Sequence, residues 1–142
     1  ATRLAKRELR NVRLACTDAR IYLRDWIADA SVQTVHLYFP DPWWKKRHHK
    51  RRVFTPEFAG ICQRILRPDG ELLVVTDVAD YATMVRETVQ QHTQMQEAEP
   101  PPEKQPGHSM DYLTHFERKF RIEGRPIYRM RFRQGRANLP GE

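Results

Sequence analysis

The segment TPEFAGICQRILRPDGELLVVTD, residues 55–77, decides the fold because its hydrophobic pattern changes at a central turn. Threonine followed by proline is typical of a helix N-cap and first turn. The apolar residues that follow share one helical face: Phe58, Ile61, Cys62, Ile65 and Leu66. Pro-Asp-Gly at residues 68–70 predicts a turn. The apolar run LLVV, residues 72–75, is typical of a strand buried on both faces of a parallel sheet.

Helical and strand patterns alternate on both sides of this segment. Helical patterns occur at residues 2–10, 21–27, 81–92 and 111–123, and strand patterns at residues 12–16, 35–39 and 127–133. The alternation predicts an α/β fold with an open sheet and right-handed crossovers. We expect a single domain over residues 1–142, with the proline-rich stretch at residues 99–107 as a mobile connection within it.

The bulk composition is typical of a folded cytoplasmic protein. With 142 residues, 39% of them hydrophobic, the chain can bury a core. No apolar run reaches the length of a membrane span, and the first ten residues lack the apolar stretch of a signal peptide. Cys16 and Cys62 have no metal-ligand spacing, so we expect two small core residues in a reducing compartment. The adjacent His48 and His49 are poorly spaced for chelation, and we expect no metal site.

Positive charge is concentrated in two segments. The net charge of the chain is +7, whereas residues 45–52 carry +6, residues 118–136 carry +7 and the remainder carries −6. Two basic segments on an otherwise acidic chain indicate a polyanion-binding face. A solvated charged surface is the alternative, and it is the favoured interpretation for residues 118–136 alone.

An aspartate follows each of the three predicted parallel strands: Asp18, Asp41 and Asp77. Ligands of open α/β sheets bind outside the carboxyl ends of the strands, so carboxylates there could hold a cationic or hydroxyl-rich ligand, or the donor edge of a base. For Asp18 and Asp77, a turn or a helix cap explains the residue equally well. Pro40 and Pro42 fix the backbone on both sides of Asp41, which favours a positioned functional group.

The segment FPDPWWKKRHHKRR, residues 39–52, combines Asp41 with two tryptophans and six Lys or Arg residues. We expect at least one tryptophan to be a core or loop-plugging residue, and the other could stack on a base, a contribution of about 1–3 kcal/mol. Phosphate contacts position a nucleic acid without reading its sequence. The residues that we expect to make them are Lys46, Arg47, Lys50, Arg51 and Arg52.

This segment, the Pro-Asp-Gly turn with LLVVTD, TxFE at residues 114–117 and GRPIY at residues 124–128 form a specific combination of motifs. Together they resemble the bacterial-type tRNA (guanine-N7)-methyltransferases, which use S-adenosylmethionine. The resemblance extends from about residue 11 to residue 132. The usual form of the first motif has proline where Trp44 stands.

The resemblance implies a Rossmann-like sheet of the SAM-dependent methyltransferase type, mostly parallel with an antiparallel C-terminal strand. It also implies methyl transfer from S-adenosylmethionine to N7 of a guanine in tRNA. Asp18 and Asp41 would contact the cofactor, and Asp41 would be the active-site residue. The substrate-binding positions implied are Lys45, Asp77, Thr114, His115, Phe116 and Glu117. TxxE is also a capping box, so Thr114 and Glu117 could start a helix, and both roles can coexist.

The implied chemistry requires no general base, because guanine N7 carries a free lone pair at neutral pH. Catalysis would then depend on alignment and on stabilising charge in a dry site. Asp41 would accept hydrogen bonds from the donor edge of the guanine, or stabilise the positive cofactor.

The glycine-rich turn and the first two strands of the family have no counterpart in these 142 residues, and no G-x-G occurs. We therefore expect weakened cofactor binding and a gap of roughly 10–15 Å beside the strand at 35–39. Residues 12–16 could pair directly with that strand, a second chain could fill the gap as a homodimer or partner, or the chain is a piece of a longer protein. We expect pairing or dimerisation in preference to an open edge.

Two rival hypotheses remain open. The chain could be a non-catalytic tRNA-binding remnant or a subunit that a partner chain completes, and binding of S-adenosylmethionine would separate this from an intact enzyme. A nuclear-import signal would explain the charge of residues 45–52 but neither Asp41 nor GRPIY.

Overall fold

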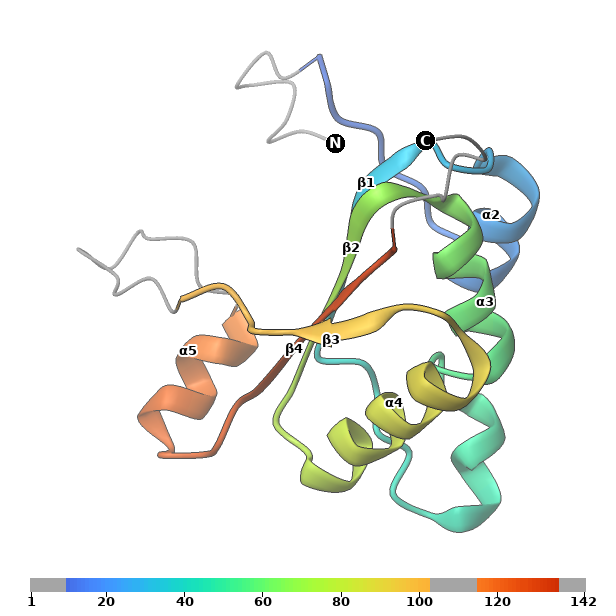
Figure 1. The fold of residues 1–142 in the computed structure, drawn as a ribbon. Coiled ribbons are helices and arrows are strands. Elements are labelled where there is room, and N and C mark those ends of the chain that lie inside the picture. Colours follow the sequence, from blue (N-terminus) through green and yellow to red (C-terminus); the bar gives the residue numbers. More distant parts are fainter. Residues whose placement is uncertain (1–9, 103–114, 136–142) are drawn as a thin grey trace.

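The computed structural model describes residues 10–102 and 115–135. The elements, in chain order, are α2 (Ala19–Trp26), β1 (Val32–Tyr38), the 3-10 helix η1 (Lys46–Arg51), α3 (Pro56–Ile65), β2 (Leu66–Thr76), α4 (Ala79–His92), β3 (Gln96–Ala98), α5 (His115–Ile122) and β4 (Tyr128–Arg133) (Figure 1). Residues 2–9 and 111–114, which belong to segments predicted to be helical, lie outside the described residues, as does most of the proline-rich connection.

The strands form one sheet in the order β1-β2-β4-β3. β1 is parallel to β2, and β4 is antiparallel to both β2 and β3. Among the strands of the described residues, three therefore run in one direction and β4 runs in the other. This confirms the predicted α/β fold with a mostly parallel sheet and an antiparallel C-terminal strand.

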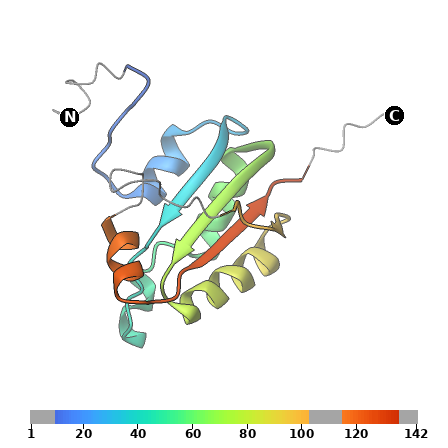
Figure 2. The same ribbon diagram turned by 90° about the vertical axis from the view of Figure 1, so that its left-hand side faces the viewer.

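Helices α3 and α4 cover one face of the sheet, and α5 packs against the other face beside the ends of β1 and β2 (Figures 1 and 2). The core lies between the sheet and α3 and α4, where Leu72, Val74, Met130 and Phe132 are at most 1% exposed. Each fully buried side chain of this size contributes about 1.5–3 kcal/mol. Side chains at alternate positions of β2 and β4 supply this core, because successive side chains of a strand point to opposite faces of the sheet.

Helix α3 begins as its sequence predicted. Thr55 has an extended backbone, and its hydroxyl accepts a hydrogen bond of 3.1 Å from the amide of Phe58. Pro56 occupies the first turn, where no helical donor is lost. Four residues of its predicted apolar face are buried, together with Ala59: Phe58, Ile61, Cys62 and Ile65. Leu66, which the pattern placed on the same face, is instead the first residue of β2.

The predicted turn at residues 68–70 lies inside β2. Val32 pairs with Leu66 and Thr34 pairs with Glu71, so the residues between Leu66 and Glu71 bulge out opposite a single residue of β1. A side chain at Gly70 would lie 2.8 Å from the carbonyl oxygen of Arg67, which explains the glycine. The later part of β2 is less enclosed than predicted, because Leu73 is only half-buried, whereas Leu72 and Val74, which point to the other face, are fully buried.

The prediction of a strand at residues 12–16 is wrong. This segment has no regular secondary structure, Leu14 is 68% exposed, and Cys16 is exposed and not the core residue expected. An isolated strand leaves its backbone groups unpaired, and these residues form no strand pairing with β1. In the described part of the chain, β1 is an edge strand, and all its residues stay at least partly exposed. Direct pairing of residues 12–16 with β1, which we expected in preference to an open edge, does not occur.

Candidate functional site at the carboxyl ends of β1 and β2

The backbone is strained on both sides of Asp41. Phe39 has a φ of 48° and Trp43 a φ of 46°, a left-handed conformation that bulky residues rarely adopt. The Phe39 amide nevertheless continues the sheet ladder by donating to the carbonyl oxygen of Val75 at 2.8 Å. Such strain costs about 1–3 kcal/mol per residue and concentrates where a loop positions functional groups. The loop after β1 is thus fixed at both ends, with Asp41 between two prolines.

A pocket of about 380 Å³ opens beside this loop. Asp41 and Asp77 both line it, so the carboxylates that follow β1 and β2 meet at one place, as the parallel sheet predicts. The rest of its lining comes from the loop, the start of α4 and the region of α5: Phe39, Pro40, Pro42, Trp44, Val78, Phe116, Phe120 and Arg125. The pocket therefore presents acidic groups among mainly apolar and aromatic walls.

Arg125 is the cation of this pocket. Its guanidinium pairs with the carboxylate of Asp77, whose side chain is 13% exposed, and lies 4.4 Å from the ring centroid of Phe120. Asp41 makes no ion pair with any described residue. The GRPIY motif contains Arg125, but its pattern gave no reason to assign this residue to the site. The pocket thus holds one neutralised carboxylate and one that is available to a ligand.

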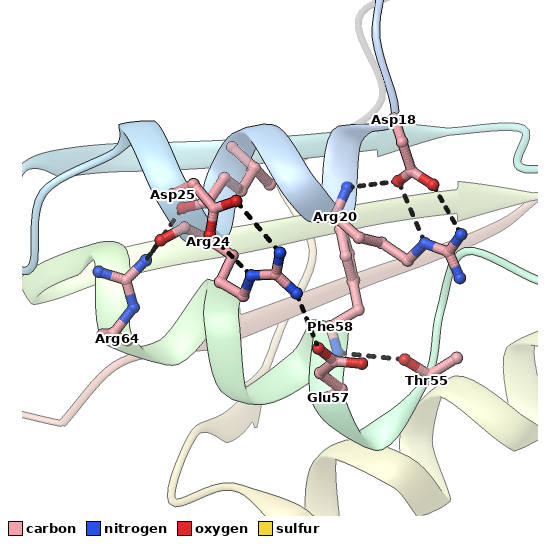
Figure 3. Close-up of polar contacts among 9 residues, drawn as sticks. Asp18, Arg20, Arg24, Asp25, Thr55, Glu57, Phe58 and Arg64 are labelled. Atoms are coloured by element: carbon pink, nitrogen blue, oxygen red, sulfur yellow. Dashed lines mark hydrogen bonds and ion pairs between the residues drawn. The ribbon is translucent and has the colours of Figure 1, made fainter.

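Asp18, the third predicted aspartate, does not line this pocket. It is the N-cap of α2 and accepts from the backbone amide of Arg20 at 2.9 Å. The Arg20 guanidinium also holds both carboxylate oxygens, as Figure 3 shows. These hydrogen bonds lower the pKa of Asp18 to about 2. Of the two roles considered for Asp18, the structure therefore shows the helix cap.

The same region shows why α2 ends where it does. The Arg64 guanidinium of α3 donates to the carbonyl oxygens of Leu23 at 2.9 Å and Arg24 at 3.1 Å. These carbonyls lack helical partners, and an arginine satisfies them well. Figure 3 shows Arg64, Arg24 and Asp25 grouped at this end of the helix, away from Asp18. This network joins α2 to α3 and has a structural role.

The basic segment at residues 45–52 divides into bound and free cations. Arg52 donates to the carbonyl oxygen of Pro42 at 2.7 Å and lies 5.4 Å from the ring centroid of buried Tyr81. Arg51 lies 5.1 Å from the ring centroid of Trp43. Both arginines therefore brace the loop that carries Asp41, a role that the sequence pattern did not separate from phosphate binding.

The remaining cations of this segment face solvent. The exposed ones are Lys45, Lys46, Arg47 and Lys50, and none of them forms an ion pair with the described residues. Lys45 directly precedes η1 and does not line the pocket. Unpaired exposed cations next to a pocket are suited to polyanion binding.

Residues 114–117, which were predicted to contact the substrate, have different surroundings in the structure. Phe116 lines the pocket, whereas His115, the first residue of α5, is exposed outside it. Glu117 is 7% exposed and accepts from Arg121 at 3.0 Å and Arg129 at 2.5 Å. It joins α5 to β4 and does not line the pocket. Thr114 lies outside the described residues.

The second basic segment is largely ion-paired. In addition to the pairs with Glu117 and Asp77, Glu71 accepts from Arg131 at 2.5 Å and from Arg133 at 3.2 Å. Each arginine of β4 therefore has an acidic partner on a neighbouring element, although Glu117 and Glu71 are each shared by two arginines. This agrees with the interpretation that residues 118–136 alone are not the polyanion-binding surface.

A larger pocket of about 730 Å³ lies at the opposite end of the sheet, near Ala30 and Leu66, and holds none of the predicted site residues.

Within residues 10–102 and 115–135, His, Cys, Asp and Glu side chains form no group of three or more that could hold a metal ion. No helix in these ranges has the length and apolar character needed to cross a membrane.

Comparisons with known proteins agree with the fold. Residues 1–130 match the model of a family described as "Putative methyltransferase". A solved SAM-dependent O-methyltransferase from Thermotoga maritima shares the fold, with a TM-score of 0.52 at 14% identity over 96% of this chain and 45% of that chain.

Two curated relatives are both named tRNA (guanine-N(7)-)-methyltransferase. The protein from Rhodopirellula baltica is 39% identical over 140 residues, covering 94% of this chain and 52% of that protein. The protein from Stutzerimonas stutzeri is 46% identical over 86 residues, covering 61% of this chain and 36% of that protein. The chain thus spans about half the length, or less, of these relatives. It belongs to this methyltransferase family, and the resemblance to tRNA (guanine-N7)-methyltransferases drawn from its motifs is confirmed.

Proposed function

We propose that the protein transfers a methyl group from S-adenosylmethionine to N7 of a guanine in tRNA. The observation that carries this proposal is the convergence of Asp41 and Asp77 in one pocket, next to the free cations of residues 45–50. The curated relatives are named for this reaction. Because tRNA is the substrate, we place the protein in the cytoplasm.

The pocket offers the groups that a guanine requires. The guanine has hydrogen-bond donors on its Watson–Crick edge, and the unpaired carboxylate of Asp41 can accept them. The aromatic walls formed by Phe116 and Phe120 can exclude water from the ring. Since N7 attacks with its own lone pair, the residues need only align the base and stabilise charge. Asp41 therefore acts as a positioning and electrostatic group and takes no proton.

The described residues fit S-adenosylmethionine in part. Bound S-adenosylmethionine supplies a methyl group on a positive sulfur, and the Asp41 carboxylate, free of any described cation, can face that charge. Asp18 can contribute less, because Arg20 occupies both of its oxygens. The edge of β1 leaves its outer backbone groups for a further strand, from a longer chain or a second copy, beside the cofactor site.

The cationic surface would hold the RNA backbone. Lys45, Lys46, Arg47 and Lys50 are exposed and have no described acidic partner, so they can release counterions when phosphates bind. These contacts fix the position of the tRNA, and the pocket selects the base. Arg51 and Arg52 contribute chiefly by bracing the loop.

A methyl-transfer assay tests the proposal. The protein is incubated with transfer RNA and S-adenosylmethionine labelled in the methyl group, and the nucleosides of the product are separated. The expected result is label in 7-methylguanosine only. Label in another nucleoside would contradict the proposed target atom. Salt-dependent tRNA binding with no label at any cofactor concentration would instead support the non-catalytic RNA-binding hypothesis.

A further inference from the structure

We propose that Trp44 is a base-stacking residue at the mouth of the pocket, where its indole takes a purine ring of the bound RNA. This inference deepens the proposed function and rests on it.

The two adjacent tryptophans have different surroundings. The indole of Trp43 is half-buried and is held by Arg51 at 5.1 Å and by His48, whose ring centroid lies 5.8 Å away in an edge-on arrangement. Trp44 is 67% exposed and forms no ring contact with any described residue. Trp43 therefore stabilises the loop through these contacts, and Trp44 is not needed for that structural role.

The exposed face of Trp44 is at the binding pocket. Its neighbours in the lining include Asp41, Asp77 and Phe116, the last of which is 56% exposed. A pocket with two exposed aromatic side chains and the unpaired carboxylate of Asp41 matches a flat ring that carries hydrogen-bond donors. Purine bases have this character, because they combine a π face with amino and imino donors.

The charge next to Trp44 identifies a nucleic acid as the source of that ring. Lys45 and Lys46 follow it directly, and residues 45–52 contain no acid. Proteins that bind single-stranded RNA combine such a cationic track with aromatic side chains on which bases stack. An apolar peptide would gain nothing from the cations, whereas an RNA strand uses both features.

Base stacking and phosphate contacts differ in how they make the affinity depend on salt concentration, and this difference allows a test. Affinity of the protein for a tRNA stem-loop with an unpaired guanine is measured over a range of salt concentrations. Trp44→Ala is expected to weaken binding roughly 5- to 100-fold at every salt concentration, with an unchanged slope. Lys46→Ala is expected to lower the salt slope by about 0.7–0.9. Trp44→Phe should recover most of the affinity.

Trp26 supplies the matched control. It is 76% exposed on α2 and lines none of the pockets described above, so Trp26→Ala should bind like the wild type. If Trp44→Ala binds as tightly as Trp26→Ala, or if it changes the salt slope, the stacking role of Trp44 is wrong while the proposed function stands. Failure of the wild type to bind RNA would overturn both. Thermal unfolding of each variant shows whether a change in affinity reflects a folding defect, and Trp44→Phe then decides the question.

Discussion

Substituting Arg52 by alanine should destabilise the fold far more than removing any other cation of residues 45–52. The guanidinium donates to the carbonyl oxygen of Pro42 at 2.7 Å, and a partly buried hydrogen bond from a charged group contributes about 1.5–3 kcal/mol. It also lies 5.4 Å from the ring centroid of Tyr81, a contact worth about 0.5–2 kcal/mol. Because neighbouring contacts are not additive, we expect a loss of about 2–4 kcal/mol in the free energy of unfolding.

Urea unfolding followed by circular dichroism measures this loss. With a slope of about 2 kcal/mol/M, the midpoint of Arg52→Ala should fall by roughly 1–2 M. Lys50→Ala removes the same charge from an exposed position and should change stability by less than about 0.5 kcal/mol. Arg52→Lys keeps the charge but loses the planar fork, so it should fall between the two. Equal midpoints for Arg52→Ala and Lys50→Ala would refute the internal role of Arg52.

Three further predictions concern other regions. Glu117→Ala should lower the free energy of unfolding by about 2–4 kcal/mol, because it removes the acidic partner that two partly buried arginines share, whereas a residue that only contacts substrate would leave urea unfolding unchanged. The Asp18–Arg20 pair should give the wild type a higher free energy of unfolding than Asp18→Asn above about pH 4, and this difference should vanish as the pH falls through the lowered pKa of about 2. If the difference in the free energy of unfolding is the same at pH 2 and pH 6, the ion pair assigned to Asp18 is wrong. A thiol reagent at pH 8 should modify exposed Cys16 rapidly and Cys62 only on unfolding, since burial raises the pKa of Cys62 to about 12; two reactive thiols in the native protein would contradict this burial.

Local sequence signals predicted the elements that depend on local chemistry. The Thr55 cap with Pro56 fixes the start of α3, the apolar run at residues 72–75 lies in the buried part of β2, and β4 coincides with the strand pattern predicted at residues 127–133. The strand predicted at residues 12–16 failed for the opposite reason, because a strand requires a partner and no neighbouring strand takes it up. The three-residue strand β3 is too short to produce a sequence signal.

The candidate site was predictable only where topology brings residues together. Asp41 and Asp77 follow parallel neighbouring strands, so their meeting in one pocket could be inferred. Side-chain partnership could not be inferred from the pattern of charges. The pairing of Arg125 with Asp77, and of Glu117 with two arginines, joins residues from distant parts of the chain. Similarly, Arg52 has the same charge as its neighbours and differs only in what it contacts.

Methyl transfer and RNA affinity measured side by side for Asp41→Ala test the account most directly. Asp41 is proposed to align the base and stabilise charge, while separate cations hold the phosphates. Turnover should therefore fall by about 100-fold or more, with RNA affinity unchanged relative to Glu87→Ala, which removes an exposed acid of α4. Full turnover in Asp41→Ala, or an equal loss of turnover and RNA affinity, would contradict this division of roles between the pocket and the basic segment.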